Sequence, residues 1–269
     1  MIVESLTEKG SGQINEDSYF VKPNYFGVFD GATGLVKYAD SSGNTGALLA
    51  SRTAKEVFEN NQNKPLLSSF KEANVKIREL EKNAGIDLNN KTCLWSTSAS
   101  VVRIEGNSVE YLAIGDSPIV IIDKDNKLNT YFIDHDLESM ILWDKMVKEG
   151  IVDKRADKRM QDQLSRTRLR SNVTYGFLNG EKEALNFVKT ANYPKENIKE
   201  ILLFTDGMLI PNERPGQPED FNKIVELFEQ DGLKNVKGYV RNMENSDPNC
   251  NKYLRSKQYD DLTAIAITF

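Results

Sequence analysis

The residues in this chain best suited to chemistry are carboxylates spread over distant segments. Three of the four acidic clusters border short apolar runs with the character of strands, and the clusters are Asn15-Glu16-Asp17, Phe29-Asp30-Gly31, Thr205-Asp206-Gly207 and Asp260-Asp261. Carboxylates that come together at strand ends repel one another and resist burial. Such a cluster needs a compensating charge, most simply a divalent cation. The pattern therefore predicts a metal site assembled from distant parts of the chain.

Composition sets the broad class of protein. The chain has 269 residues, of which 39% are hydrophobic and 28% charged, and its net charge is -5. These values are typical of a globular protein, and the acidic balance disfavours a nucleic-acid partner. No apolar run approaches the roughly 18–20 residues that span a bilayer, and no secretory signal follows Met1. Cys93 and Cys250 lie far apart, in no metal-binding or redox spacing. We therefore expect a reduced, cytoplasmic protein with no membrane partner; the sequence carries no signal of oligomeric state.

Two helices are predicted early in the chain, where apolar residues recur at helical spacing. These residues are Ala47, Ala50, Ala54, Val57 and Phe58 in the first helix, and Leu66, Phe70, Ala73, Ile77 and Leu80, behind Pro65, in the second. Two further helices are expected from about Leu137 to Glu149 and around Phe221 to Phe228.

Strands account for most of the remaining apolar runs. The predicted strands are Tyr25–Phe29, Ser98–Ile104, Ser108–Ile114, Pro118–Asp123, Leu128–Ile133, Ile201–Phe204 and Leu262–Phe269. Turn-forming clusters separate the four strands between Ser98 and Ile133, and such short connections join antiparallel neighbours. We expect a four-stranded meander there. Antiparallel strands interrupted by helix pairs indicate an α+β fold.

The order of the motifs resembles a known family. The motifs are N-E-D (15–17), V-F-D-G (28–31), G-D-S (115–117), T-D-G (205–207) and D-D-L-T (260–263), with Asp134-His135 after the predicted meander. Their order resembles that of the metal-dependent serine/threonine protein phosphatases of the 2C type. The resemblance covers nearly the whole chain. It implies two antiparallel sheets packed as a sandwich and flanked by pairs of helices, a four-layer αββα arrangement. Residues 1–269 would then form one domain, with a flap-like insertion at about 150–175.

The same resemblance implies a ligand set for two Mn²⁺ or Mg²⁺ ions. Asp30 would bridge the two metals and Gly31 would contribute its backbone carbonyl, while Asp206 and Asp260 complete the shell of one ion. Asp30, Asp206 and Asp260 are thus the expected catalytic residues.

Three further carboxylates have counterparts in the family. Glu16 and Asp17 resemble the residues that hold metal-bound waters, and Asp116 resembles the one that, with Asp206, binds a weaker third metal in some members.

The chemistry of these residues agrees with the resemblance. Hard oxygen ligands select magnesium or manganese over zinc. A pair of such ions lowers the pKa of a shared water from about 15.7 towards neutrality, and the resulting hydroxide attacks a phosphate monoester in line. The expected function is dephosphorylation of phosphoserine and phosphothreonine in protein substrates.

Simpler interpretations exist for single motifs. Asp30-Gly31 and Asp206-Gly207 are also ordinary strand-to-turn corners, because Asp and Gly favour turns. Gly115-Asp116-Ser117 is also a sound hairpin turn. His135, the only histidine, invites a catalytic role, but its place after a strand favours a structural one.

The substrate-binding residues depart from the family pattern. Gly12 stands where many members have a phosphate-binding arginine, Ala32 where some have a histidine as general acid, and Pro118 where Gly-Asp-Ser is usually followed by arginine. Losing the arginine removes a bidentate phosphate contact. The alternative function is therefore a catalytically weak or inactive metal-binding regulatory module on the same fold.

A basic segment from Lys154 to Arg170 lies where the family carries its variable flap. Two interpretations are open for it. It is either a solvated surface or an electrostatic guide for phosphorylated substrates, in which Arg166, Arg168 and Arg170 bind substrate.

Overall fold

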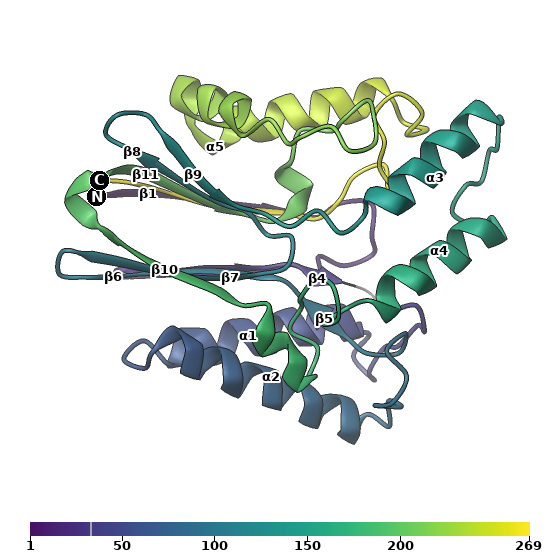
Figure 1. Ribbon diagram of the computed structural model, residues 1–269, viewed down its shortest axis with the longest axis horizontal. Helices are drawn as coiled ribbons and strands as arrows, with labels where there is room; N and C mark the ends of the chain where they lie inside the picture. Colours follow the sequence, from purple (N-terminus) through teal and green to yellow (C-terminus); the bar gives the residue numbers. More distant parts are fainter. Residues whose placement is uncertain (33) are drawn as a thin grey trace.

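The computed structural model describes residues 1–32 and 34–269. Two five-stranded antiparallel sheets are stacked face to face, and helices cover the outer side of each (Figure 1). The order of layers is therefore helix, sheet, sheet, helix, which confirms the predicted α+β sandwich.

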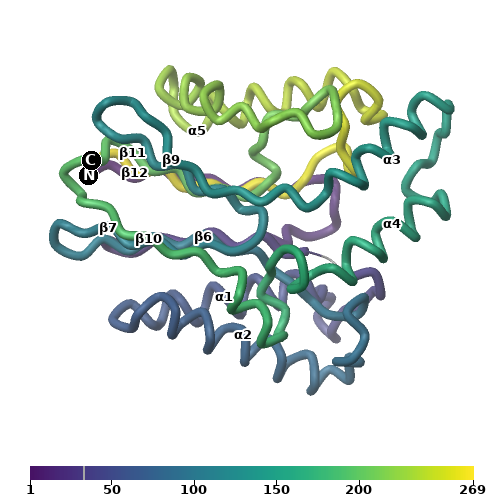
Figure 2. Tube along the Cα trace, in the orientation of Figure 1, coloured from purple at the N-terminus to yellow at the C-terminus, as the bar shows by residue number. Residues whose placement is uncertain are grey.

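Each sheet combines strands from distant parts of the chain. The first has the order β1 (Ile2–Glu8), β12 (Leu262–Thr268), β11 (Ile198–Phe204), β8 (Ile119–Asp123), β9 (Leu128–Tyr131). The second has the order β10 (Lys189–Pro194), β7 (Ser108–Ile114), β6 (Ala99–Glu105), β3 (Tyr25–Phe29), β2 (Ser18–Lys22). A small separate sheet pairs β4 (Gly31–Ala32) with β5 (Ser96–Thr97). Because β1 and β12 pair along their length, the two chain ends lie side by side (Figure 2).

The helices form two covering layers and one projection. Helices α1 (Gly46–Asn60) and α2 (Leu66–Asn83) cover the second sheet, and α5 (Phe221–Ser246), which is interrupted at Asp231 and Gly232, covers the first (Figure 1). Helices α3 (Leu137–Lys148) and α4 (Lys158–Leu169) lie beyond one end of the sandwich. The short 3-10 helices are η1 (Lys182–Asn186), η2 (Lys195–Asn197) and η3 (Asp206–Met208). Within residues 1–32 and 34–269, no helix combines the length and apolar character that a bilayer span requires.

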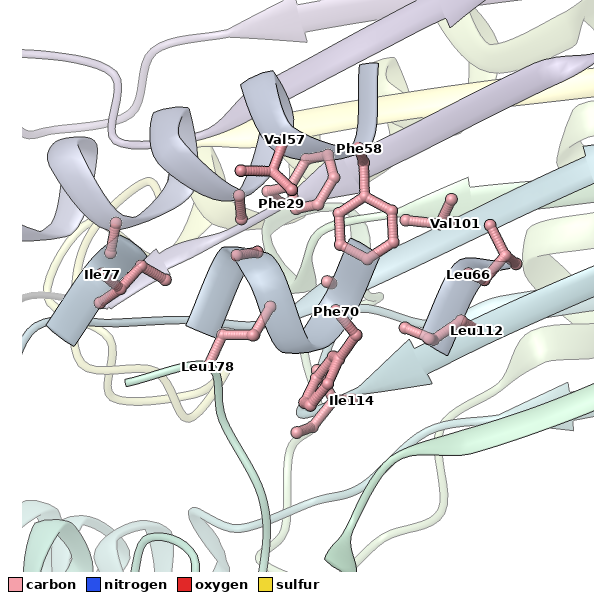
Figure 3. Close-up of a cluster of buried hydrophobic side chains, with 14 of the residues drawn as sticks. Phe29, Val57, Phe58, Leu66, Phe70, Ile77, Val101, Leu112, Ile114 and Leu178 are labelled. Atoms are coloured by element: carbon pink, nitrogen blue, oxygen red, sulfur yellow. The ribbon is translucent and has the colours of Figure 1, made fainter. Parts of the chain in front are cut away.

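Apolar layers hold the sandwich together. Phe58 of α1 and Phe70 of α2 are buried against the second sheet, where Val101 and Leu112 belong to the same cluster (Figure 3). Each such phenylalanine contributes roughly 1.5–3 kcal/mol relative to an exposed one. The predicted helical faces are buried as expected, except that Leu80 is exposed. The strand ends that carry the acidic residues are thus attached to a tightly packed frame.

The predicted four-stranded meander is wrong. Strands β6 and β7 form one hairpin in the second sheet, and β8 and β9 form another in the first sheet. The chain crosses between the sheets at residues 115–118, so the hairpin interpretation of Gly115-Asp116-Ser117 is wrong as well. Gly115 makes the change of direction with a φ of 81°, and buried Ser117 accepts a hydrogen bond at its carbonyl from Ser100 Oγ at 2.6 Å. The consequence is that Asp116 lies at the crossing between the sheets.

Glycines allow backbones to approach closely beside the acidic residues. Neither Gly31 nor Gly207 has a positive φ angle, so a turn conformation does not explain them. A Cβ atom at Gly207 would lie 2.0 Å from the backbone oxygen of Asp261, and one at Gly31 would lie 2.5 Å from that of Glu16. These glycines are required because the segments that carry the carboxylates pack backbone against backbone.

We predict that Gly207→Ala destabilises the fold by about 1–3 kcal/mol, because the new methyl group must displace the backbone at Asp261. Chemical denaturation measures the effect. Gly238→Ala is the matched control: nothing lies within 4 Å of its added methyl group, and in α5 it should stabilise by about 0.5–1 kcal/mol. Equal stability of Gly207→Ala and the wild type would contradict the close approach.

Candidate active site

Five aspartates from different elements converge at one end of the sandwich. Asp17 precedes β2, Asp30 follows β3, Asp116 lies between β7 and β8, Asp206 follows β11, and Asp260 precedes β12. The charges of the other four all act on Asp30. The structure therefore brings together predicted residues that lie up to about 240 positions apart in the sequence.

Burial and mutual repulsion disfavour the ionised form of Asp17, Asp30, Asp116 and Asp206. The pKa values of Asp30 and Asp206 lie well above their usual range, first because the groups are desolvated and then because neighbouring aspartates repel their charge. The two side chains are close enough for one protonated carboxyl to donate a hydrogen bond to the other, which opposes the rise in the pKa of Asp206. Burial also raises the pKa of Asp116. In the absence of a cation, the cluster therefore retains protons that exposed aspartates would lose near pH 4.

Asp17 is the most enclosed member of the cluster. Its pKa is raised to about 8, chiefly because the carboxyl is buried. Hydrogen bonds from threonines oppose this rise, and the charges of Asp261 and Asp260 add to it. Thr205 Oγ1 donates to Asp17 Oδ2 at 2.8 Å, and the backbone N–H of Thr263 donates to Thr205 Oγ1 at 2.9 Å. This chain of bonds sets the orientation of the Asp17 carboxyl.

A lysine supplies positive charge to the cluster. Lys257 Nζ lies 2.5 Å from Asp260 Oδ1. Burial acts to lower the pKa of Lys257, but the charges of Asp260, Asp206 and Asp30 outweigh it, and the pKa lies above its usual value. One ammonium group compensates only part of the charge of several carboxylates, so the site retains an affinity for further cations.

The donor set fits a hard divalent cation in its chemistry. Asp17 Oδ1 and Asp116 Oδ1 are buried and have no hydrogen-bond partner among the described residues. Such orphaned oxygens are expected where an ion completes the site. In the described part of the chain, however, no three acidic, histidine or cysteine side chains are already arranged around a single point. Binding therefore requires the available carboxylate oxygens to move towards a common point.

The other predicted metal residues lie at the edge of this cluster. Glu16 Oε1 accepts a hydrogen bond from Thr45 Oγ1 at 2.6 Å, next to the start of α1. Gly31 pairs with Thr97 in the small sheet. His135 Nδ1 lies 3.4 Å from Asp116 Oδ2, and its ring stacks on Tyr175 with centroids 4.7 Å apart. His135 is thus placed to hold Asp116, in keeping with a structural role.

The three predicted substrate-binding arginines have different surroundings. Arg166 is exposed on α4. Arg168 Nη1 donates to Ser96 Oγ at 2.7 Å, and the charge of Asp116 acts on its guanidinium. Arg170 forms an ion pair with Glu138 at 2.8 Å. Of the three, Arg168 is the one that the structure relates to the carboxylate cluster, and a substrate contact by any of them stays a prediction.

Two residues to which the sequence analysis gave no role organise the site. Asp261 accepts the backbone N–H groups of Gly10 and Glu16, both at 2.7 Å, and so fastens the N-terminal segment to the end of β12. Lys257, three residues before Asp260, provides the internal cation. A lysine close to a predicted metal ligand was the available signal for it, but the Lys257–Asp260 contact depends on the fold of a loop.

Comparison with known proteins gives this geometry a context. A sequence model of protein phosphatase 2C matches residues 8–243. Among solved structures, the serine/threonine phosphatase Stp1 from Staphylococcus aureus is 16% identical, with a TM-score of 0.60 over 99% of this chain and 94% of that one. The catalytic domain of PstP in complex with two manganese ions is also 16% identical, with a TM-score of 0.56 over 98% of this chain and 96% of that one.

A third similar structure is PppA from Pseudomonas aeruginosa, 15% identical, with a TM-score of 0.58 over 100% of this chain and 97% of that one. No curated protein shows significant sequence similarity to the chain. At such low sequence identities, the structural similarity shows the fold alone. The sequence model matches most of the chain and therefore shows the family. The stacked antiparallel sheets and the matched residues lead to one conclusion: this chain belongs to the protein phosphatase 2C family.

Proposed function

We propose that this protein is a metal-dependent phosphatase of phosphoserine and phosphothreonine in proteins. The observation that carries the proposal is the convergence of Asp17, Asp30, Asp116, Asp206 and Asp260 in a chain of the 2C family. Raised pKa values caused by burial and neighbouring charges are typical of functional carboxylates. We also propose that residues 1–269 act as one domain, with the flap at about 150–175.

Asp30, Gly31, Asp206 and Asp260 would hold two Mn²⁺ or Mg²⁺ ions. Bound there, the ions would supply a water of lowered pKa as the nucleophile and would neutralise charge on the phosphoryl oxygens. Glu16 and Asp17 would orient waters at the site, and Asp116 would serve a weaker third ion.

The rest of the chain would orient these ligands. Thr205 holds Asp17 and His135 holds Asp116, so each carboxylate keeps one oxygen bonded to the protein and the other available. Such supporting contacts typically alter metal affinity or activity by 10–100-fold when removed.

One observation favours the alternative, a metal-binding regulatory module with little turnover. Gly12 offers no side chain to a phosphate. Lys257 lies at the site, but it already forms an ion pair with the Asp260 carboxylate. A substrate phosphate would therefore lack the bidentate partner that arginine provides.

The proposal predicts hydrolysis of p-nitrophenyl phosphate, whose good leaving group needs no general acid. Activity should appear with Mn²⁺ or Mg²⁺ and disappear in excess EDTA, because the nucleophile depends on the metals. Release of p-nitrophenol measures it. Hydrolysis that persists unchanged in EDTA would contradict the metal-dependent mechanism, and metal binding without hydrolysis would favour the regulatory module.

We also predict a graded response to single substitutions. Asp30→Asn should abolish turnover and, in metal-free protein at neutral pH, raise the melting temperature, because it removes a carboxyl that its neighbours repel. Glu16→Gln should reduce turnover by about 10–100-fold.

Asp125→Asn serves as the control for both variants. Asp125 is exposed in the turn between β8 and β9, so its substitution should alter neither activity nor melting. Steady-state kinetics and thermal melting of the three variants decide the matter. Wild-type turnover in Asp30→Asn would mean that the site lies elsewhere.

A further inference from the structure

A cavity of about 690 Å³ opens beside the proposed metal site, on the side where Gly12 stands. Its lining comes from the N-terminal segment, the residues before α1, the segment before β12 and the loop between α3 and α4. Glu16 and Asp260 form part of the wall, so a group bound in the cavity would lie next to the reacting phosphate. The volume is in the range of pockets that bind small ligands or side chains.

Three cationic side chains line this cavity: Lys37, Arg155 and Lys257. Lys257 is bonded to Asp260, but Lys37 and Arg155 are exposed and have no acidic partner in the part of the chain that the structure describes. They are therefore available to an anion from outside.

The acidic residues of the wall are already engaged. Asp260 pairs with Lys257, Asp261 accepts two backbone N–H groups, and Glu16 accepts the hydroxyl of Thr45. Among the charged residues of the wall that the structure describes, Lys37 and Arg155 are thus the two without a partner in the protein. Tyr38 and Tyr259 add aromatic surface to the same wall, against which a peptide can pack.

The flap holds Arg155 at the cavity through its neighbours. Lys154 is buried, donates to Asn251 Oδ1 at 2.7 Å and lies over the ring of Trp143. Trp143 Nε1 in turn donates to the carbonyl of Cys250 at 2.8 Å. These contacts fasten the loop between α3 and α4 to the segment that leads to Lys257. Because Lys154 is held in place, the backbone of the next residue, Arg155, is held beside the cavity.

Two other arginines of the flap are paired locally. Arg159 pairs with Glu149 and Asp157, and Arg170 pairs with Glu138. Arg155, in contrast, lines the cavity and has no acidic partner in the part of the chain that the structure describes.

We propose that Lys37 and Arg155 form a subsite for a second anionic group of the substrate, so that the enzyme prefers phosphopeptides with an acidic or phosphorylated residue beside the phosphoserine or phosphothreonine. The inference rests on the proposed phosphatase function. A carboxylate and a phosphate share the required chemistry, since both accept charge-assisted hydrogen bonds from lysine and arginine.

The test compares Lys37→Ala/Arg155→Ala with wild type in the full-length, Mn²⁺-loaded protein. The substrates are p-nitrophenyl phosphate and three phosphopeptides of equal length. One peptide has neutral flanking residues, one has glutamates flanking the phosphorylated residue, and one carries a second phosphoserine. Exposed ion pairs are individually weak, so the loss of two of them should raise the KM for the anionic peptides about 2–30-fold. The neutral peptide and p-nitrophenyl phosphate should be unaffected, and the effect should shrink in high salt. The peptide with the larger effect identifies carboxylate or phosphate as the preferred group.

Lys158→Ala/Lys234→Ala is the matched control, because it removes two exposed positive charges outside the cavity. It should leave every KM unchanged. A uniform loss on all four substrates, an effect equal to that of the control, or no effect would overturn the subsite. If the wild type does not hydrolyse p-nitrophenyl phosphate, the phosphatase function itself fails. Fluorescence polarisation with the labelled peptides then decides the subsite, since it needs no turnover: equal affinity of wild type and variant for all peptides would reject it.

Discussion

Several carboxylates meet at one end of the sheet sandwich, and their repulsion is the constraint on which the site depends. Asp30 and Asp206 lie close enough to share a proton, and the charges of three further aspartates act on Asp30. A fold that retains such a cluster must supply opposite charge or protons. Here Lys257 supplies one charge, and burial and repulsion raise the pKa values of Asp17, Asp30 and Asp206, which favours bound protons. The site is therefore suited to exchange those protons for metal ions.

The architecture explains how distant residues reach this end of the sandwich. Stacking two sheets brings the end of β3 in one sheet beside the ends of β11 and β12 in the other, and the crossing at residues 115–118 adds Asp116. Gly31 and Gly207 permit the backbones to pack at these ends, and Asp261 fastens the N-terminal segment across them. The same residues that look like simple turn motifs are thus required for packing around the site.

Much of this could be predicted from the sequence, because it rests on local pattern. The apolar runs placed β3 and β7 at their observed bounds, and the helical spacing from Ala47 identified the buried face of α1. The order of the acidic motifs indicated the family, which the sequence model confirms. The meander failed because a short connection signals a change of direction but not whether the next strand joins the same sheet. Lys257 and Arg155 could not be assigned, since their neighbourhood is set by loops packed across the fold.

The central claim is that the carboxylate cluster binds divalent metal ions in exchange for protons. Isothermal titration of metal-free protein with Mn²⁺ at pH 7, in two buffers of different ionisation enthalpy, tests it most directly. Because the pKa of Asp17 is raised to about 8 and those of Asp30 and Asp206 lie well above the usual range, the account predicts binding of about two ions with release of protons. Absence of binding, or binding whose heat is the same in both buffers, would contradict it.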